Sequence, residues 1–244
     1  MPDLAIIVPT RGRPRNLARL LDAVHTTMRL DTHVWAGVDD DDPELAAYRR
    51  VFRARRGPGD RLLTGPRDGL TGWTNKIAAK TAVKYPFLGS FGDDHVPQTP
   101  AFDRKLVTAI GDMGGTGFAY PFDGNRDDVP EAVVMSASIV RALGWMALPS
   151  STHWFIDDTW ADLGRGAGCL RYCRAVAVPH AHPIATGQPA DRLYRDNAKK
   201  IGPDRDAWSA WREAQMAGDV AKILALRQVK ETTARQRNAG KPAS

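Results

Sequence analysis

Two hydrophobic patterns alternate along the first half of the chain. Short, mostly apolar runs, which are typical of strands buried on both faces, cover residues 4–10 and 87–91, and further strands are predicted at 33–38 and 61–64. Between these runs, apolar side chains recur at helical spacing, as Leu17, Leu21, Val24 and Met28 do after Pro14. The pattern therefore predicts strands that alternate with helices.

This alternation continues to about residue 120. Helices are predicted from Pro14 onward, from Pro43 toward Arg55, from about Trp73 to Lys84 and from about Pro100 to Met113, followed by a strand near 116–120. Strands and helices in alternation predict an α/β fold with a mainly parallel central sheet flanked by helices. Ligands of such sheets bind outside the carboxyl ends of the strands.

The second half of the chain is less regular. A strand and a helix are predicted within 131–146, another strand within 163–178, and two amphipathic helices after Pro203, divided at Gly218. The last dozen residues are mostly polar and are predicted to form a frayed tail. Neither a repeat nor a linker divides the sequence, so one domain with appended C-terminal helices is expected.

The composition narrows the class of protein. With 43% apolar and 25% charged residues, the 244-residue chain does not resemble a disordered one. No apolar stretch approaches the roughly 18 residues of a membrane span, and the N-terminal apolar run is too short for a secretory signal. The two cysteines are too few for a disulfide framework or a four-ligand zinc site. A cytoplasmic protein is therefore expected.

Most of the net charge of +6 lies toward the C-terminal end. Residues from Asp191 onward include 12 Lys/Arg and 7 Asp/Glu, a balance of +5. A basic end of this kind binds nucleic acid or an anionic surface in some proteins and is a solvated helix and tail in others. The charge alone does not decide between these two interpretations.

Acidic residues follow two of the predicted strands. Asp93 and Asp94 come directly after the fourth strand, and Asp39 to Asp42 follow the second. Adjacent carboxylates repel each other unless a cation or hydrogen-bond donors compensate, so Asp93 and Asp94 are candidates for binding Mg²⁺ or Mn²⁺ at a diphosphate. A helix cap and turn is the structural alternative. Asp39 could accept hydrogen bonds from a base or ribose, whereas the next three aspartates fit a helix cap.

Arg11 and Arg13 flank Gly12 in the turn between the first strand and the first helix. Two guanidinium groups beside a helix N-terminus suit an anionic or nucleotide ligand, and a solvent-exposed basic turn is the alternative. The turn matches neither the dinucleotide-binding Gly-x-Gly-x-x-Gly pattern nor a Walker loop. Dinucleotide binding and P-loop chemistry are therefore disfavoured.

The segment HWFIDDTW places Asp157 and Asp158 among aromatic residues. Apolar surroundings raise the pKa of a carboxyl group, as a general base requires, while a helix start with both tryptophans in the core is the alternative. His180 and His182 alternate along an extended segment, so at most one of them faces a given site.

Together these segments resemble the GT-A fold glycosyltransferases of the broad family-2 group. The resemblance covers about residues 4–183 and rests on five motifs in order, namely IIVPTRGRP, VDDDDPEL, FLGSFGDDHVPQTPAFDRKL, HWFIDDTW and VPHAHP. The third motif departs from the strict Asp-x-Asp of the family, because it reads Gly92-Asp93-Asp94. The chain is also similar to a subset of these enzymes from bacteriophages and actinobacteria, which implies a bacterial or phage-infected host cell.

The resemblance implies a nucleotide-diphospho-sugar transferase. A catalytic domain is expected at 1–190, with a donor half at about 1–97 and an acceptor half at about 98–190, then helices packed on it at 191–230 and a flexible tail at 231–244. The residues implied for donor binding are Pro9, Thr10, Arg11, Arg13, Asp39, Asn75, Lys76 and Asp93. Asn75 and Lys76 are included only because their predicted helix begins near the donor edge.

The resemblance also implies the metal and the catalytic groups. Asp94 and His180 are the implied ligands of Mn²⁺ or Mg²⁺, with His182 as the alternative histidine. Asp157 or Asp158 is the implied general base of an inverting reaction, in which an acceptor hydroxyl attacks the anomeric carbon of the donor sugar. The acceptor stays open among a protein, a glycan and a DNA hydroxyl.

Three other functions compete with this interpretation. One is a DNA-modifying glycosyltransferase that acts on a hydroxylated base. Another is a nucleotidyltransferase, which shares the sheet but normally has a more Gly-rich first loop. The third is a nucleic-acid-binding protein without catalysis, and the acidic sheet edge argues against it because carboxylates repel phosphates unless a metal ion is bound.

Overall fold

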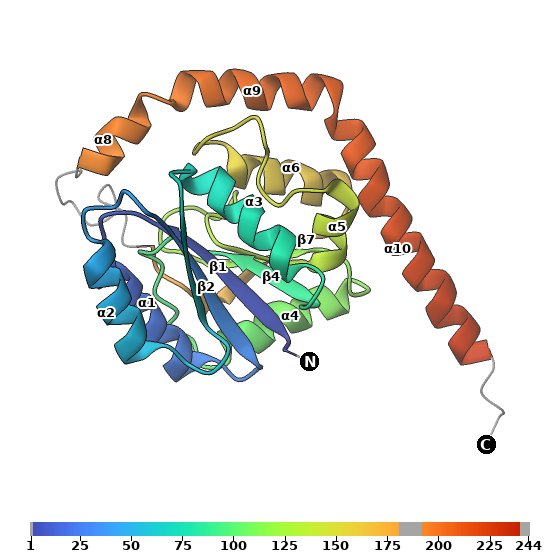
Figure 1. The fold of residues 1–244 in the computed structure, drawn as a ribbon. Helices are drawn as coiled ribbons and strands as arrows, with labels where there is room; N and C mark the ends of the chain where they lie inside the picture. Colours follow the sequence, from blue (N-terminus) through green and yellow to red (C-terminus); the bar gives the residue numbers. More distant parts are fainter. Residues whose placement is uncertain (1, 181–191, 240–244) are drawn as a thin grey trace.

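A computed structural model describes residues 2–180 and 192–239 of the chain (Figure 1). Within these residues, seven strands form one sheet in the order β3-β2-β1-β4-β6-β5-β7. The strands are β1 Leu4–Thr10, β2 Thr32–Asp39, β3 Arg61–Gly65, β4 Phe87–Ser90, β5 Phe118–Phe122, β6 Val133–Ser136 and β7 Leu170–Ala177. β6 runs antiparallel to both of its neighbours, and the other pairings are parallel. The predicted α/β fold with a mainly parallel sheet is therefore confirmed.

Helices connect and flank these strands. In the described part of the chain they are α1 Pro14–Thr27, α2 Leu45–Arg55, α3 Gly69–Thr81, α4 Phe102–Asp112, α5 Ala137–Leu143, α6 Ile156–Gly166, α8 Arg192–Ala198, α9 Ile201–Ala214 and α10 Met216–Ala239. α3 begins four residues before its predicted start, because Gly69 adopts a φ of +67° at little cost and turns the chain into the helix. α9 and α10 meet at Gln215 rather than at Gly218.

α10 also continues to Ala239, through most of the segment that was expected to be a tail. Residues 231–239 include Glu, Ala, Arg and Gln, which are good helix formers, besides two Thr and one Asn, so this polar composition is compatible with a helix. None of the helices within residues 2–180 and 192–239 has the length and apolar character of a bilayer span.

Side chains of β1 alternate between two hydrophobic cores, one on each face of the sheet. Ala5 and Ile7 pack with α3, α5 and α6, while Leu4, Ile6 and Val8 pack with α1, α2 and α4 (Figure 1). All five side chains are fully buried. Helices on both faces explain why the strand is a continuous apolar run rather than an alternating one.

The C-terminal helices pack on the same body. α9 arches over the molecule, and α10 passes α5 and α6 (Figure 1). Trp211 of α9 and Ile223 of α10 are buried in the core that contains these two helices. α9 and α10 are therefore fastened to the sheet domain by apolar contacts.

The carboxyl ends of β1, β2 and β4 meet at one edge of the sheet. Because these strands are parallel neighbours, the turns after Thr10, Asp39 and Ser90 start side by side. The chain after β7 returns to this edge, where His180 forms an antiparallel bridge with His95. The topology therefore gathers the polar segments of the sequence in one place.

Candidate active site

A cavity of about 290 Å³ opens at this edge of the sheet. The predicted site residues that line it are Pro9, Thr10, Arg11, Arg13, Asp39, Asp93, Asp94, Asp157 and His180. The loop before α6 adds His153 and Trp154 to the lining, and the junction of α8 and α9 adds Asn197 and Lys200. One cavity thus joins the donor, metal and base candidates.

Arg11 and Asp39 connect the turns that follow β1 and β2. Nη1 of Arg11 lies 2.8 Å from Oδ2 of Asp39 and 2.5 Å from Oδ1 of Asp41. Oδ1 of Asp39 accepts hydrogen bonds from Nε1 of Trp73 at 2.7 Å and from the backbone N–H of Asp68 at 3.2 Å. The buried Asp39 carboxylate therefore fixes Arg11 and Trp73 on one wall of the cavity.

Asp93 is buried and hydrogen-bonded to residues of β1 and α1. Oγ1 of Thr10 donates to Oδ2 of Asp93 at 2.5 Å, and Nδ2 of Asn16 donates to Oδ1 at 3.3 Å. Nη1 of Arg13 lies 3.8 Å from Asp93 and 3.7 Å from Asp94. Burial and the charge of Asp94 raise the pKa of Asp93 to about 6, although Thr10 and Arg13 oppose the shift. Two ionised carboxylates are therefore disfavoured at this position, and a cation at Asp94 would reduce their repulsion.

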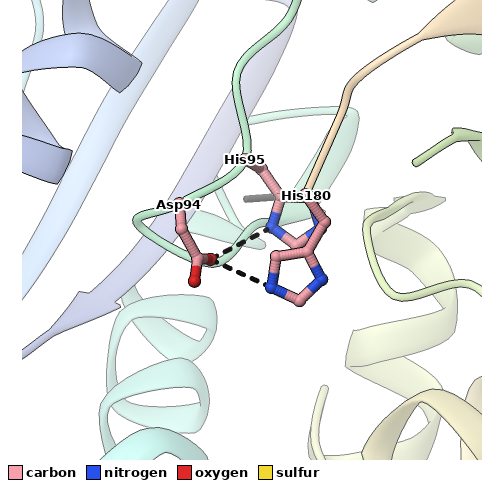
Figure 2. Close-up of side chains that lie close together, drawn as sticks. All are labelled: Asp94, His95 and His180. Carbon is pink, nitrogen blue, oxygen red and sulfur yellow. Dashed lines mark ion pairs between the residues drawn. The ribbon is translucent and has the colours of Figure 1, made fainter. Parts of the chain in front are cut away.

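Asp94, His95 and His180 bring their ligand atoms within 4.8 Å of one another (Figure 2). Oδ1 of Asp94 lies 3.1 Å from Nε2 of His180 and 3.9 Å from Nδ1 of His95. The two imidazole rings stack with their centroids 4.2 Å apart. A carboxylate oxygen beside imidazole nitrogen is a donor set that binds divalent metal ions, so the residues present fit such an ion.

Glu131 orients His180. Oε2 of Glu131 lies 2.6 Å from Nδ1 of His180, and Nδ2 of Asn125 donates to the same oxygen at 3.3 Å. Burial opposes protonation of His180, but its contacts with Asp94 and Glu131 outweigh burial and raise its pKa to about 10. A carboxylate on Nδ1 leaves Nε2 facing Asp94, which is the orientation that metal-binding histidines commonly have.

His95 is held in a different way. The backbone N–H of Gly92 donates to Nδ1 of His95 at 2.9 Å, so Nδ1 is the acceptor of the neutral ring and Nε2 carries the hydrogen. This Nε2 is buried and has no hydrogen-bond partner among the described residues. Burial and the nearby His180 lower the pKa of His95 to about 3. Asp94 and His180 are therefore the better ligand candidates, and His95 supports His180 by stacking.

Asp157 and Asp158 lie in the first turn of α6 but in different surroundings. Asp157 lines the cavity, and burial together with the charge of Asp158 raises its pKa to about 7. Asp158 lies outside the cavity lining; burial raises its pKa too, and the charge of Arg126 opposes that shift. Of the two, the geometry favours Asp157 as the general-base candidate.

Asn75 lies away from the position that the sequence predicts for it. Its Oδ1 accepts hydrogen bonds from the backbone N–H groups of Met146 and Ala147 at 2.8 and 2.9 Å, and its Nδ2 donates to the carbonyl of Ala147 at 2.8 Å. The amide thus fastens α3 to the segment after α5, outside the cavity lining. Because both polar atoms are used there, the expected donor contact of Asn75 is not supported.

Lys76 is also outside the cavity lining. Its Nζ lies 3.0 Å from Oδ2 of Asp68 and 4.6 Å from the ring centroid of Trp73. It therefore packs behind the wall that Trp73 forms. His182, the alternative metal ligand, lies outside the described residues.

Several residues of the cavity lining were not predicted from the sequence. Among them are the polar or charged residues Arg67, His95, Glu131, Asn197 and Lys200. His95 directly follows Asp94, so the motif itself could have indicated it. Glu131, Asn197 and Lys200 reach the cavity from distant parts of the chain, and no local pattern marks them.

No protein-family model matches the chain, and no curated protein matches its sequence. Solved structures match its fold. The mannosyltransferase PcManGT from Pyrobaculum calidifontis, in complex with GDP-Man and Mn²⁺, has a TM-score of 0.64 at 12% identity, covering 99% of this chain and 84% of that chain. TarS 1-349 of S. aureus, in complex with UDP-GlcNAc, has a TM-score of 0.59 at 10% identity, covering 95% and 73%.

A third similar structure is glucosyl-3-phosphoglycerate synthase from Mycobacterium tuberculosis, in complex with Mn²⁺, UDP and glucosyl-3-phosphoglycerate. Its TM-score is 0.54 at 10% identity, and the match covers 78% of this chain and 82% of that chain. Against TarS 1-349 in complex with UDP, the chain spans only 62% of the solved protein. These neighbours are GT-A glycosyltransferases, and the chain described here has their fold.

Proposed function

We propose that the chain is a metal-dependent glycosyltransferase that moves a sugar from a nucleotide-diphosphate donor to an acceptor hydroxyl, with inversion at the anomeric carbon. The observation that carries this proposal is a single cavity, in a glycosyltransferase fold, that contains the Asp94–His180 pair and the Asp157 carboxylate. Structural neighbours were solved with GDP-Man or UDP-GlcNAc, and two of them with Mn²⁺, which supports it.

The donor would lie along the turns after β1 and β2, against Pro9 and Thr10. Arg11 and Arg13 offer guanidinium groups to the diphosphate beside the N-terminus of α1, where the helix dipole favours an anion. Asp39 accepts three hydrogen bonds from protein groups, and a carboxylate has about four acceptor positions, so one position is left for a ribose or base.

Asp94 and His180 would hold Mn²⁺ or Mg²⁺, and Asp93 would contact the metal or the ribose. Such an ion neutralises the charge that develops on the leaving diphosphate. His180 can ligate only through a neutral Nε2, so its proton stays on Nδ1, where Glu131 accepts it.

Asp157 would accept the proton of the acceptor hydroxyl. That oxygen attacks the anomeric carbon, the bond from this carbon to the donor phosphate oxygen breaks, and the nucleoside diphosphate leaves. A pKa of about 7 leaves a substantial fraction of Asp157 ionised at neutral pH and basic enough to take the proton.

The acceptor is the hydroxyl of a protein, a glycan or DNA. The balance of +5 from Asp191 onward favours a polyanion, because neutralising phosphates releases counterions and strengthens binding. The acidic groups around the cavity disfavour a polyanionic acceptor. A small saccharide acceptor needs no basic region on the protein. A hydroxylated DNA base is therefore kept as the alternative acceptor.

A thermal-shift screen of nucleotide sugars with and without Mn²⁺ tests the proposal, followed by a hydrolysis assay with the donor that responds most. We expect one donor to raise the melting temperature only with metal present, to be hydrolysed to its nucleoside diphosphate, and to lose both effects in Asp94→Asn. Release of pyrophosphate from a nucleoside triphosphate would favour a nucleotidyltransferase instead. Absence of turnover with every donor would favour a binding protein.

A further inference from the structure

A buried carboxylate of α9 holds the loop that precedes α6. Oδ1 of Asp204 accepts hydrogen bonds from the backbone N–H and the hydroxyl of Thr152, at 2.9 and 3.1 Å. Oδ2 accepts from the backbone N–H groups of His153 and Trp154, both at 2.8 Å. Asp204 is only 2% exposed, so these donors are what compensates for the burial of its charge.

This loop ends in a backbone conformation that bulky residues rarely adopt. Phe155 has a φ of +63°, in the left-handed region. Its ring stacks on Trp208 of α9, with centroids 5.2 Å apart and an interplanar angle of 18°. α9 therefore contacts both the loop and the residue before α6, and the first turn of α6 contains Asp157.

The same contacts build one wall of the cavity. His153 and Trp154 line the cavity, as do Asn197 and Lys200 at the junction of α8 and α9. Nε1 of Trp154 donates to the carbonyl of Asn197 at 2.8 Å. The wall and the start of α6 are thus tied together through the C-terminal helices.

We propose that Asp204 is a positioning residue, which holds loop 152–155 from α9 so that Asp157 faces the bound donor. This inference rests on the proposed function, because it takes Asp157 as the general base. Asp204 lies outside the cavity lining, so it acts through the loop. An amide in place of this carboxylate keeps one acceptor oxygen and turns the other position into an NH2 donor, so the backbone N–H groups at that position lose their acceptor. The loop and the first turn of α6 are then held less firmly.

Asp204→Asn is the test variant, and Asp219→Asn is the matched control. Asp219 is a buried carboxylate of α10 that accepts from Nε1 of Trp211 at 3.0 Å and from Nζ of Lys222 at 2.9 Å, outside the cavity lining. Both changes remove a buried charge from the C-terminal helices, so both are expected to lower the melting temperature. The pair therefore separates loss of stability from loss of positioning.

Turnover is measured with the nucleotide sugar that responds most in the thermal-shift screen, with Mn²⁺ present. Asp204→Asn is expected to lower kcat for donor hydrolysis by about 10- to 100-fold, because small displacements of a catalytic group cost rates of this order. Its calorimetric affinity for the same donor should match that of the unmodified protein, and Asp219→Asn should keep its kcat. An active Asp204→Asn variant with unchanged kcat would overturn the proposal.

Hydrogen exchange of the backbone amides at 156–160 gives a readout that does not depend on turnover. These amides should exchange faster in Asp204→Asn than in Asp219→Asn. Trp208→Leu, which removes the stacking on Phe155 but keeps Asp204, should change kcat and exchange in the same direction, and it replaces Asp204→Asn if that variant does not fold. If the unmodified protein hydrolyses no nucleotide sugar, the proposed function fails. In that case, equal hydrogen exchange at 156–160 in Asp204→Asn and Asp219→Asn would overturn the positioning role of Asp204 as well.

Discussion

Glu131 contacts Nδ1 of His180 and would keep a proton on that nitrogen when Nε2 gives up its own to bind a metal ion, and this makes Glu131 a residue on which metal affinity depends. The distance from Oε2 of Glu131 to Nδ1 of His180 is 2.6 Å. Glu131→Gln keeps an acceptor oxygen but removes the charge that makes Nε2 a stronger ligand. We expect Mn²⁺ to bind about 10- to 100-fold more weakly, which is the usual effect of losing such a partner.

Electron paramagnetic resonance of free Mn²⁺ measures this affinity directly. Glu213→Gln is the control, because Glu213 is an exposed acid of α9. Equal Mn²⁺ affinity in the Glu131→Gln variant and in the unmodified protein would contradict the orientation of His180 described above.

Asp157 must be ionised to act as a base, so its raised pKa sets the pH at which the protein works. Since burial and the charge of Asp158 raise this pKa to about 7, turnover should rise as pH increases through about 7. Asp157→Asn should lower turnover by about 10²- to 10⁴-fold and keep donor affinity. Asp158→Asn should keep most of the turnover and move the rise to lower pH, because it removes a neighbouring negative charge.

Rate measurements from pH 5 to 9 on all three proteins check these expectations, with the range chosen to span about two units on each side of the pKa. Loss of turnover in Asp158→Asn but not in Asp157→Asn would assign the base to Asp158. Near-normal turnover in both variants would place the base elsewhere or indicate a retaining reaction.

At the scale of elements, close packing between β2 and α3 shapes the donor wall. A Cβ added at Gly37 would lie 2.7 Å from two ring carbons of Trp73, whose Nε1 holds Asp39. Gly37→Ala should therefore destabilise the protein by about 1–3 kcal/mol, as overpacking of a core commonly does, and weaken the thermal shift given by the donor.

Urea unfolding measures the change, and Gly111→Ala in α4 is its control. A Cβ at Gly111 meets no atom within 4 Å, so this change should be neutral or should raise stability by about 0.5–1 kcal/mol through lower unfolded-state entropy. Equal stability of Gly37→Ala and the unmodified protein would show that Trp73 can move without cost.

The sequence predicts the elements and the sites where a local pattern encodes them. β1 is a continuous apolar run that ends at Thr10, because helices cover both faces of the sheet and its side chains pack into a core on each face. Asp94 and His180 are predictable because each follows a strand that ends at the ligand edge. The sequence does not indicate where the Asn75 side chain lies, because its position depends on a tertiary contact with Met146 and Ala147.

Other parts of the site have no local pattern at all. Glu131 meets His180 across 49 residues of sequence, and Asp204 meets Trp154 across 50. In the sequence, an aspartate or glutamate that will be buried looks the same as one that will be exposed. Only the arrangement of the elements that cover it makes the difference. Tertiary packing therefore supplies the orientation of His180 and the wall before α6.

At the scale of the whole molecule, charge is divided between an acidic sheet edge and basic C-terminal helices. From Arg227 onward the chain has five Lys/Arg and one Glu, and α10 includes most of them. We expect duplex DNA to bind the full chain only at low salt, with an affinity that falls steeply as salt increases, and not to bind a chain truncated after Leu226.

Fluorescence anisotropy with labelled duplex DNA across a salt series compares the two chains. Circular dichroism of the truncated chain is the control, because Arg227 also donates to the carbonyls of Met113 and Thr116. A salt-dependent affinity that survives truncation would favour DNA as the acceptor over a protein or glycan.

Because Asp204 of α9 holds the loop that precedes α6, the order in which the chain is synthesised affects when the protein becomes active. A nascent chain folds from its N-terminus, so the sheet and Asp94 emerge from the ribosome before α9 does. Until α9 has emerged and docked, loop 152–154 lacks the acceptor for its backbone N–H groups. We therefore expect a ribosome-bound chain stalled before α9 to bind metal without turning over donor, so that synthesis itself delays activity until the fold is closed.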